Sequence, residues 1–236
     1  MIPSTDLTAR GPRQALCRAL CRTLCLATCV LATPTAGADA RMLLPGSADV
    51  LDGWTARAFE GETDYAAARS EAPVVDCGPY VVRARADASA SGRFLEFDEP
   101  VAPDALLSWS WTVAAPVDVP DETRREGDDF AARVYVMFSG GFAFWRTTSL
   151  VYVWGDDDAP AEPWPNPYTE QAVMMTVRRG DGGRWHRETR DLAADYRRAF
   201  GRAPPEIVAV AIMSDTDQSG ASAEAAYACM TLTPTS

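Results

Sequence analysis

Regular alternation of apolar and polar residues is the feature that most constrains the fold of this chain. Leu107, Trp109, Trp111 and Val113 are separated by single Ser or Thr residues, the period-two pattern of a strand with one buried face. We therefore expect Trp109 and Trp111 in a hydrophobic core. Other apolar or alternating runs predict further strands at 130–138, 149–154, 171–178, 184–190, 207–213 and 225–232.

One helix interrupts this pattern, and it has clear start and stop signals. Asp191 is a good N-cap, Gly201 is a good C-terminal stop, and Leu192, Tyr196 and Phe200 fall on one helical face. Two long loops, 116–127 and 155–167, are rich in Pro, Gly and acidic residues. Many strands, long loops and one short helix predict an all-β fold, a single jelly-roll-like β-sandwich.

The amino terminus has the layout of a secretory signal peptide. Several Arg residues precede the short apolar run 23–32, and small residues at 36–40 suit a cleavage site. That apolar run is too short to span a bilayer. We expect a signal peptide at residues 1–40, one sandwich domain at 41–236, and an exported protein, periplasmic or extracellular. Cys77 and Cys229 would remain, either as a disulfide or as two buried thiols.

The charge of the chain restricts its partners. The net charge is −11, with 33 acidic residues against 22 basic ones, all of them Arg. Nucleic acids and anionic lipids are disfavoured because they are bound through excess positive charge. A neutral polar ligand, such as a glycan, or a cation fits better. His186 is the only histidine, which excludes zinc sites with two or more His, and no phosphate-binding glycine motif or nucleophile elbow is present.

A short acidic stretch at the end of a predicted strand suggests a cation site. Asp215, Asp217 and Ser219 alternate before Gly220, as ligands do in the first half of a calcium loop. An EF-hand is excluded, because its twelfth position would be Ala226. The pattern predicts a structural calcium held by Asp215, Asp217 and Ser219, with Asp128 or Asp129 contributing from across the fold. The alternative is an Asp-rich turn that ends a strand.

Two further groups are candidates for ligand binding. Asp129, Arg133 and Tyr135 share a strand face directed away from the expected core, where they could bind a sugar. The alternative is a solvated Asp129–Arg133 salt bridge. The loop aromatics Trp164 and Tyr168, with Asn166, form the second group; for these the alternative is a loop pinned to the sandwich by its aromatic rings.

Several motifs together resemble the DUF3047 family of exported bacterial proteins. They are the segments 90–92, 107–111, 127–135, 151–155 and 166–168, Trp185 with Glu188, and 211–220 followed by Tyr227. The resemblance implies a sandwich similar to galactose-binding-like modules and implies no established activity. The chain departs from the pattern after Tyr227, where Ala228 and Cys229 replace the Gly-Asp of the family.

Three hypotheses about function follow. The first is a binding module for carbohydrate or another polar component of the cell envelope. The second is a hydrolase or lyase that acts on glycans through Asp129, Glu188 or Asp215, since such chemistry requires paired carboxylates. The third is a structural or assembly partner in the periplasm. The sequence leaves the oligomeric state open.

Overall fold

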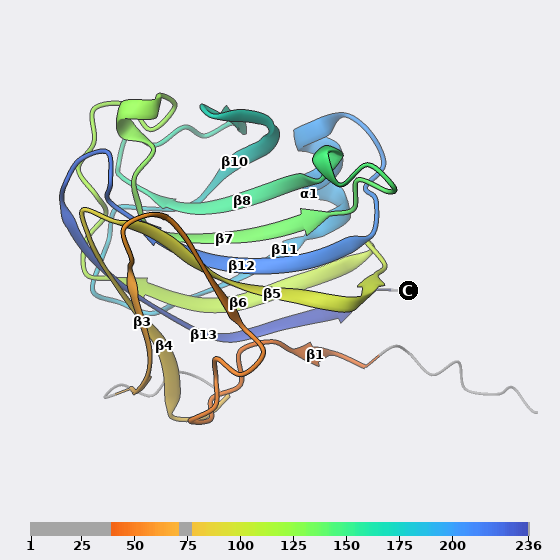
Figure 1. The fold of residues 1–236 in the computed structure, drawn as a ribbon, viewed down its shortest axis with the longest axis horizontal. Coiled ribbons are helices and arrows are strands. Elements are labelled where there is room, and N and C mark those ends of the chain that lie inside the picture. Colours follow the sequence, from red (N-terminus) through yellow and green to blue (C-terminus); the bar gives the residue numbers. More distant parts are fainter. Residues whose placement is uncertain (1–38, 71–76, 236) are drawn as a thin grey trace, which may run out of the picture. The chain divides into compact units, whose positions relative to one another are not determined.

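The computed structural model describes residues 39–70 and 77–235, which form two β-sheets packed face to face (Figure 1). The predicted signal peptide lies outside the described residues except for its last two. In the six-stranded sheet the order is β11 (His186–Asp191), β6 (Ala105–Val113), β13 (Ser222–Pro234), β4 (Tyr80–Asp87) and β3 (Asp64–Arg69), with β1 (Arg41–Met42) paired to β13.

The seven-stranded sheet carries the features that matter for function. Its order is β2 (Thr55–Glu60), β5 (Ala90–Val101), β12 (Ile207–Asp215), β7 (Phe130–Phe138), β8 (Thr148–Gly155), β10 (Thr169–Arg179) and β9 (Trp164–Asn166). Strands β8 and β10 run parallel, and the other strand pairs of the described chain are antiparallel. The predicted fold class, a β-sandwich with one helix, is confirmed.

The core between the sheets is built on the aromatic residues that the alternation predicts. Trp109 and Trp111 are fully buried. The Trp109 ring stacks on Tyr152 at 5.3 Å between centroids, and Trp111 packs against Trp154 at 5.5 Å. These contacts join β6 of one sheet to β8 of the other, so large aromatic side chains supply much of the buried apolar area that holds the layers together.

The one α-helix of residues 39–70 and 77–235, α1 (Leu192–Phe200), begins and ends where its sequence signals predict. The Asp191 carboxylate accepts a hydrogen bond from the N–H of Ala194 at 2.9 Å, and Gly201 ends the helix with φ of 66°. Tyr196 packs on Phe138 of β7 at 4.6 Å between ring centroids. The helix thus covers one end of the sandwich core. No helix in the described residues is long and apolar enough to cross a membrane.

The strands that sequence patterning misses lie mainly at sheet edges. None of β1 to β5 is predicted individually, and β9 lies inside the predicted loop 155–167. Every residue of β2 is exposed and most of β3 is also exposed. An edge strand with little burial has no apolar alternation to detect, because its ladder hydrogen bonds come from a neighbour distant in sequence.

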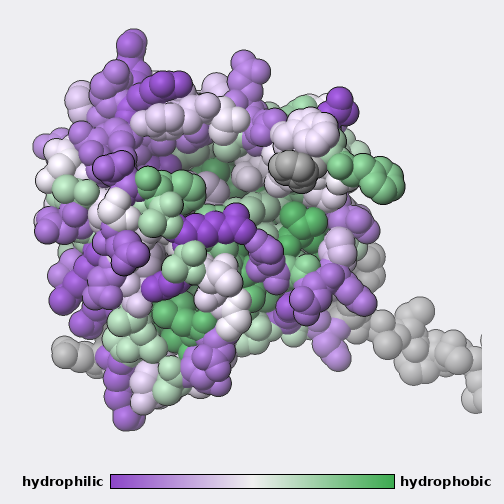
Figure 2. All heavy atoms as spheres, viewed as in Figure 1, coloured by the Kyte–Doolittle hydropathy of each residue, from purple (hydrophilic) through white to green (hydrophobic). Residues whose placement is uncertain are grey.

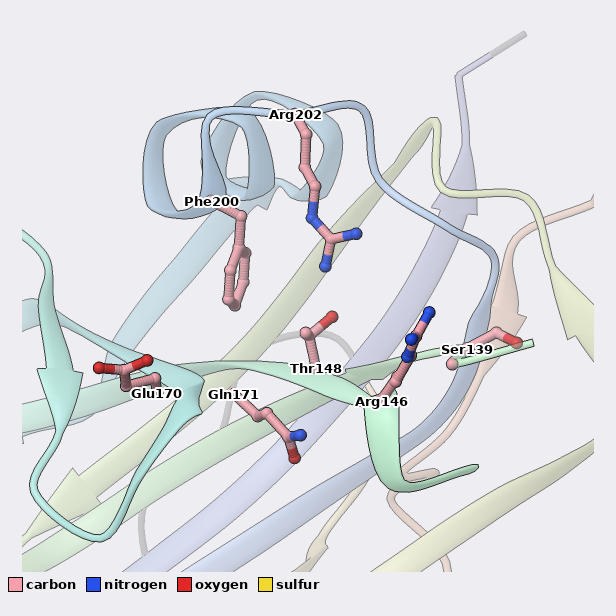
Figure 3. Close-up of a pocket in the computed structure, with 8 residues that line it drawn as sticks. Ser139, Arg146, Thr148, Glu170, Gln171, Phe200 and Arg202 are labelled. Carbon is pink, nitrogen blue, oxygen red and sulfur yellow. The ribbon is translucent and has the colours of Figure 1, made fainter. Parts of the chain in front are cut away.

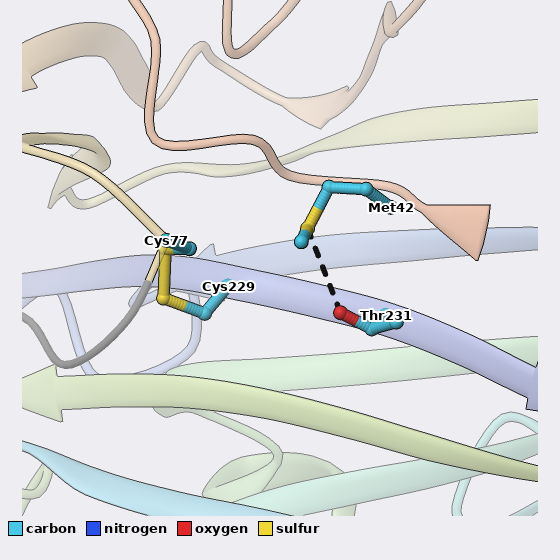
Figure 4. The surroundings of a disulfide bond; sticks show 4 residues. All are labelled: Met42, Cys77, Cys229 and Thr231. Carbon is cyan, nitrogen blue, oxygen red and sulfur yellow. Dashed lines mark hydrogen bonds between the residues drawn. A yellow bond between two sulfur atoms is a disulfide. The ribbon is translucent and has the colours of Figure 1, made fainter. Parts of the chain in front are cut away.

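A disulfide joins Cys77 to Cys229, which decides between the two alternatives left open for these cysteines (Figure 4). Their Cα atoms lie 5.4 Å apart, and 152 positions separate them in the sequence. Beside the bond, the Thr231 hydroxyl donates to the sulfur of Met42 at 3.5 Å. A crosslink of this kind typically stabilises a fold by about 2–4 kcal/mol. It anchors the segment before β4 to the last strand.

Candidate functional site: a cavity on the seven-stranded sheet

A cavity of about 470 Å³ lies on the face of the seven-stranded sheet directed away from the core. We call it the central cavity. On β7, Val134 and Val136 point into the core, whereas Arg133 and Tyr135 line the cavity, as strand alternation requires. Strands β2, β5 and β12 and the β9–β10 turn supply the other walls. Figure 2 shows apolar side chains gathered over the middle of one face, with hydrophilic side chains around them.

A buried ionic cluster forms the floor of the cavity, and Arg133 is its centre. Its Nε donates to Asp215 Oδ1 at 2.9 Å and its Nη1 donates to Asp128 Oδ1 at 3.1 Å. Its Nη2 donates to Asp215 Oδ2 and to the carbonyl oxygen of Asp128. The hydroxyl of Tyr135 accepts from Nη1 at 3.4 Å, and the guanidinium lies 4.6 Å from the Phe130 ring centroid. All three guanidinium nitrogens are therefore satisfied within the protein.

Burial sets the protonation of this cluster. It raises the pKa of Asp215 to about 8, with Asp128 and Asp129 adding to the shift and Arg133 opposing it. Burial also raises the pKa of Asp128. For Arg133, burial acts to lower the pKa, but Asp215, Tyr135 and Asp128 together outweigh it and hold the pKa well above its ordinary value. Arg133 therefore stays charged, and its charge opposes the rise in the pKa of Asp215 and of Asp128.

The alternative interpretation of this face, a solvated Asp129–Arg133 salt bridge, is wrong, because Asp129 and Arg133 are each only 1% exposed. Asp129 does not pair with Arg133. Its two oxygens accept the backbone N–H groups of Gln218, at 3.1 Å, and Ser219, at 2.6 Å. The cross-strand neighbour decides the pairing: Asp215 lies opposite Phe130 in the β12–β7 ladder, close to Arg133. Alternation gives the face of a residue but not its partner on the next strand.

The acidic residues proposed as calcium ligands already accept hydrogen bonds within the protein. One oxygen from each of Asp129, Asp215 and Asp217 lies within 4.8 Å of the others. However, Arg133 occupies both Asp215 oxygens, backbone N–H groups occupy those of Asp129, and the Gln218 side-chain amide donates to Asp217. Calcium needs six to eight oxygens free to coordinate.

The rest of the predicted calcium set is also engaged. Asp128 binds Arg133 and Asn166, and the Ser219 hydroxyl accepts the N–H of Ala221 at 3.2 Å. Gly220 adopts φ of 67° and donates its N–H to Thr216 at 2.9 Å. The arrangement is that of a turn ending β12, which was the alternative interpretation of this stretch.

The predicted loop group divides between a small apolar cluster on the outer face of the seven-stranded sheet and the cavity. Trp164 is 7% exposed and packs with Phe130 and Met174, so it pins the loop. Asn166 lines the cavity and donates to Asp128 Oδ2 at 3.3 Å. Tyr168 also lines the cavity, and its ring is 52% exposed.

The position of Tyr168 is set from two sides. Its hydroxyl donates to Gln218 Oε1 at 2.6 Å. The Arg125 guanidinium lies 4.8 Å from the ring centroid, and Arg125 also donates to the Pro167 carbonyl at 3.1 Å. An exposed ring is thus held in place at one rim of the cavity.

Phe59 on β2 lies at another part of the rim, and sequence reasoning missed it. It is 63% exposed and packs on Phe94 of β5 at 6.4 Å between centroids. Phe94 in turn lies under the Arg57 guanidinium, 4.7 Å from the ring centroid. The sequence signal was an aromatic residue in an otherwise polar segment. That signal does not show which other strands lie beside the residue, so it does not reveal a cavity.

Glu188 is separate from this site. It lies on β11 of the other sheet, where Arg178 donates to it at 2.6 Å and the Trp111 indole N–H donates at 3.3 Å. It does not line the central cavity. Of the three acids considered for glycan hydrolysis, Asp129 and Asp215 are occupied by N–H donors and Glu188 is engaged elsewhere.

Comparison with known families assigns the chain. Residues 52–231 match the model of DUF3047, described as a protein of unknown function. The chain belongs to the DUF3047 family. The match confirms the resemblance seen in the sequence. The comparison with curated proteins found no match.

Solved structures with a similar fold include several carbohydrate-binding modules. A family 30 module of a Clostridium thermocellum cellulosomal cellulase is 8% identical with a TM-score of 0.48, covering 83% of this chain and 98% of that one. A family 11 module of the same organism is 10% identical with a TM-score of 0.45, covering 84% and 95%. The K1 adhesin domain of Lys-gingipain from Porphyromonas gingivalis is 10% identical with a TM-score of 0.42, covering 84% and 98%.

Proposed function

We propose that this DUF3047 protein is an exported binding module that holds a carbohydrate in the central cavity. One observation carries the proposal: a cavity with a rigid polar floor has exposed aromatic rings, Phe59 and Tyr168, at its rim. Sugars present C–H faces that pack on aromatic rings and hydroxyl groups that exchange hydrogen bonds with amides and carboxylates. Both kinds of partner line this cavity.

Within the central cavity, the chemistry of the lining favours neutral groups of a ligand over charged groups. The guanidinium of Arg133 is already satisfied by Asp128 and Asp215, so no free cation remains at the floor to attract an anion. The polar side chains near the rim, Asn166 and Gln218, offer amide groups that both donate and accept. A volume of about 470 Å³ falls within the usual range for small-molecule sites.

The position of the floor groups supports binding without rearrangement. Arg133, Asp128 and Asp215 lie on adjacent strands or next to them, and hydrogen bonds already fix their side chains. A preorganised site loses little conformational entropy when the ligand binds. Binding of the ligand would restrict mainly the exposed side chains at the rim of the cavity.

Export is part of the proposal. The amino-terminal sequence has the charge, apolar run and small residues of a signal peptide. The Cys77–Cys229 disulfide is the kind of bond that persists in oxidising compartments. Cell fractionation with N-terminal sequencing of the mature protein tests this part, and an unprocessed cytosolic chain would contradict it.

Glycan-array screening followed by calorimetry tests the binding function. We expect the wild-type protein to bind a subset of glycans, and Tyr168→Ala and Phe59→Ala each to weaken binding about tenfold, which corresponds to about 1.4 kcal/mol. Phe142→Ala is the matched control, because Phe142 is an exposed aromatic residue that does not line the cavity. If the folded wild-type protein binds no glycan, the proposal is wrong.

A further inference from the structure

A second cavity, of about 440 Å³, lies beside the end of α1. Its walls come from the β7–β8 connection (139–147), the start of β10 and the residues that follow the helix (Figure 3). We call it the arginine pocket, because Arg146 and Arg202 both line it. Figure 3 shows these two side chains extending into the same space, with the ring of Phe200 beside them.

The positive charge in this pocket is not compensated by ion pairs. No carboxylate of the described residues lies within 4.0 Å of the guanidinium nitrogens of Arg146 or Arg202. One acidic residue, Glu170, also lines the pocket, so two guanidiniums face a single carboxylate. This local excess of positive charge is unusual in a chain whose net charge is −11.

Backbone structure holds Arg146 in position. It ends the short 3-10 turn Phe144–Arg146, where its N–H donates to the Ala143 carbonyl at 2.8 Å. Gly140 permits the tight path of this loop, since a Cβ there would come within 2.4 Å of the Ala143 oxygen. Gln171 of β10 donates a side-chain hydrogen bond to the Trp145 carbonyl. The loop is therefore tied to the sheet beside the pocket.

Arg202 is positioned by the end of the helix. It follows Gly201, whose left-handed conformation turns the chain out of α1. The Arg202 guanidinium lies 5.8 Å from the centroid of the buried Tyr196 ring. The Tyr196 hydroxyl shares a 2.9 Å hydrogen bond with Thr148, which lines the same pocket. Two guanidiniums from different segments are thus directed to one place.

The arginine pocket and the central cavity are lined by neighbouring residues near the start of β8 and of β10, which point to opposite faces of the sheet. On β8, Thr148 lines the arginine pocket and Ser149 lines the central cavity. On β10, Gln171 and Ala172 are divided in the same way. An extended ligand in the central cavity would have to pass around the first residues of β8 and β10 to reach the arginines.

We propose that the arginine pocket binds a carboxylate or sulfate group of the glycan held in the central cavity, which makes the ligand an acidic polysaccharide. Guanidinium groups bind planar oxyanions through paired N–H donors, and they do so best where no internal carboxylate competes. The inference rests on the proposed function for the position of the glycan, but its own evidence comes from different residues.

Matched pairs of oligosaccharides test the proposal on the full mature protein. The probes are oligomers of galacturonate, mannuronate and hyaluronate, each with its carboxyl-reduced counterpart, and heparin oligomers with their desulfated counterparts. We expect the wild-type protein to bind at least one acidic form at least tenfold more tightly than its carboxyl-reduced or desulfated counterpart. The Arg146→Gln/Arg202→Gln variant should lose most of this preference and keep its affinity for the carboxyl-reduced or desulfated form.

The control variant is Arg187→Gln, which removes a positive charge from a part of the surface that lines neither cavity. Arg187 is exposed on β11 of the other sheet, lines neither cavity and forms no ion pair with a described residue, so its replacement changes the net charge outside both cavities. It should leave the preference unchanged. The carboxyl and sulfate pairs separate the two sources of negative charge.

The outcomes distinguish the two proposals. Binding of neutral oligomers with no preference for acidic ones would overturn this inference and leave the proposed function intact. A preference that persists in the double variant would also overturn it, because the charge would be bound elsewhere. Failure of the folded protein to bind any acidic or neutral glycan would overturn both.

Discussion

The central cavity and the arginine pocket have similar volumes, about 470 and 440 Å³, but they treat positive charge in opposite ways. In the first, Arg133 is buried and bound by two carboxylates. In the second, Arg146 and Arg202 are exposed and form no ion pair with a described residue.

The difference follows from the cost of desolvation. A buried cation loses its hydration and needs internal partners, whereas an exposed cation keeps water that a ligand can displace. Arg133 therefore stabilises the floor of the central cavity, whereas Arg146 and Arg202 remain available to bind a ligand. An arginine that lines a cavity is a ligand-binding candidate only when its charge is not already compensated.

The strongest test of this difference between the two cavities is to remove the buried guanidinium of Arg133. Arg133→Met should lower the free energy of unfolding by about 3–5 kcal/mol, because it leaves buried carboxylates without a partner. Urea denaturation followed by circular dichroism measures the change. Adding Asp215→Leu should restore part of the loss. A cost for Arg133→Met below about 1 kcal/mol, within the range of surface substitutions, would show that the cluster is not structural.

Glu122 offers a buried carboxylate that forms no ion pair with a described residue, although Arg133 and Arg179 act to lower its pKa. It is 4% exposed; its Oε1 accepts the N–H of Asp156 at 2.8 Å, and its Oε2 has no hydrogen-bond partner among the described residues. Burial raises its pKa from 4.5 to about 7. The folded state thus favours the protonated form, so this group costs nothing below pH 4.5 and destabilises the fold increasingly as the pH rises to about 7.

Glu122→Gln should remove that penalty, since the amide is neutral at every pH and its oxygen can still accept from Asp156. We expect the variant to be more stable than the wild type by about 1–3 kcal/mol at pH 8, with little difference at pH 4. Denaturant unfolding across this pH range measures it. Equal pH dependence in both proteins would show that Glu122 ionises as freely in the fold as in water.

The exposed arginines should behave differently from Arg133 under the same substitution. Arg146→Met and Arg202→Met should each change the free energy of unfolding by no more than about 0.5 kcal/mol, the usual range for surface positions. The same denaturation assay gives the comparison with Arg133→Met directly. A loss of several kcal/mol at either position would mean that the arginine pocket is structural and would remove the contrast between the two cavities.

The smallest effect is expected from metal removal. EDTA or millimolar calcium should leave the melting temperature unchanged, because N–H donors already occupy the oxygens of Asp129 and Asp215. Differential scanning calorimetry checks this, with elemental analysis of the purified protein as the control. A ligand bound only by the folded state must raise stability, so a calcium-dependent shift would reinstate the predicted metal site.

Much of the fold can be predicted from local sequence, because strand alternation and helix caps are short-range signals. The pattern around Trp109 and Trp111 places both in the core, and Asp191 and Gly201 bound the helix to the residue. The segments shared with DUF3047 identify the family. Edge strands such as β2 escape this reasoning, since their exposed residues have no periodicity.

The sequence by itself determined the sandwich class, the core aromatics, the helix and the family membership, all of which depend on neighbours within a few residues or on collected motifs. Only the tertiary structure decided that Arg133 pairs with Asp215 and Asp128, that Asp129 braces a turn, and that Trp164 is buried. The physical reason is that strand order and register are non-local. Alternation shows which face a side chain takes, and the strand that pairs beside it determines whether that face is solvent, a cavity or an ion pair.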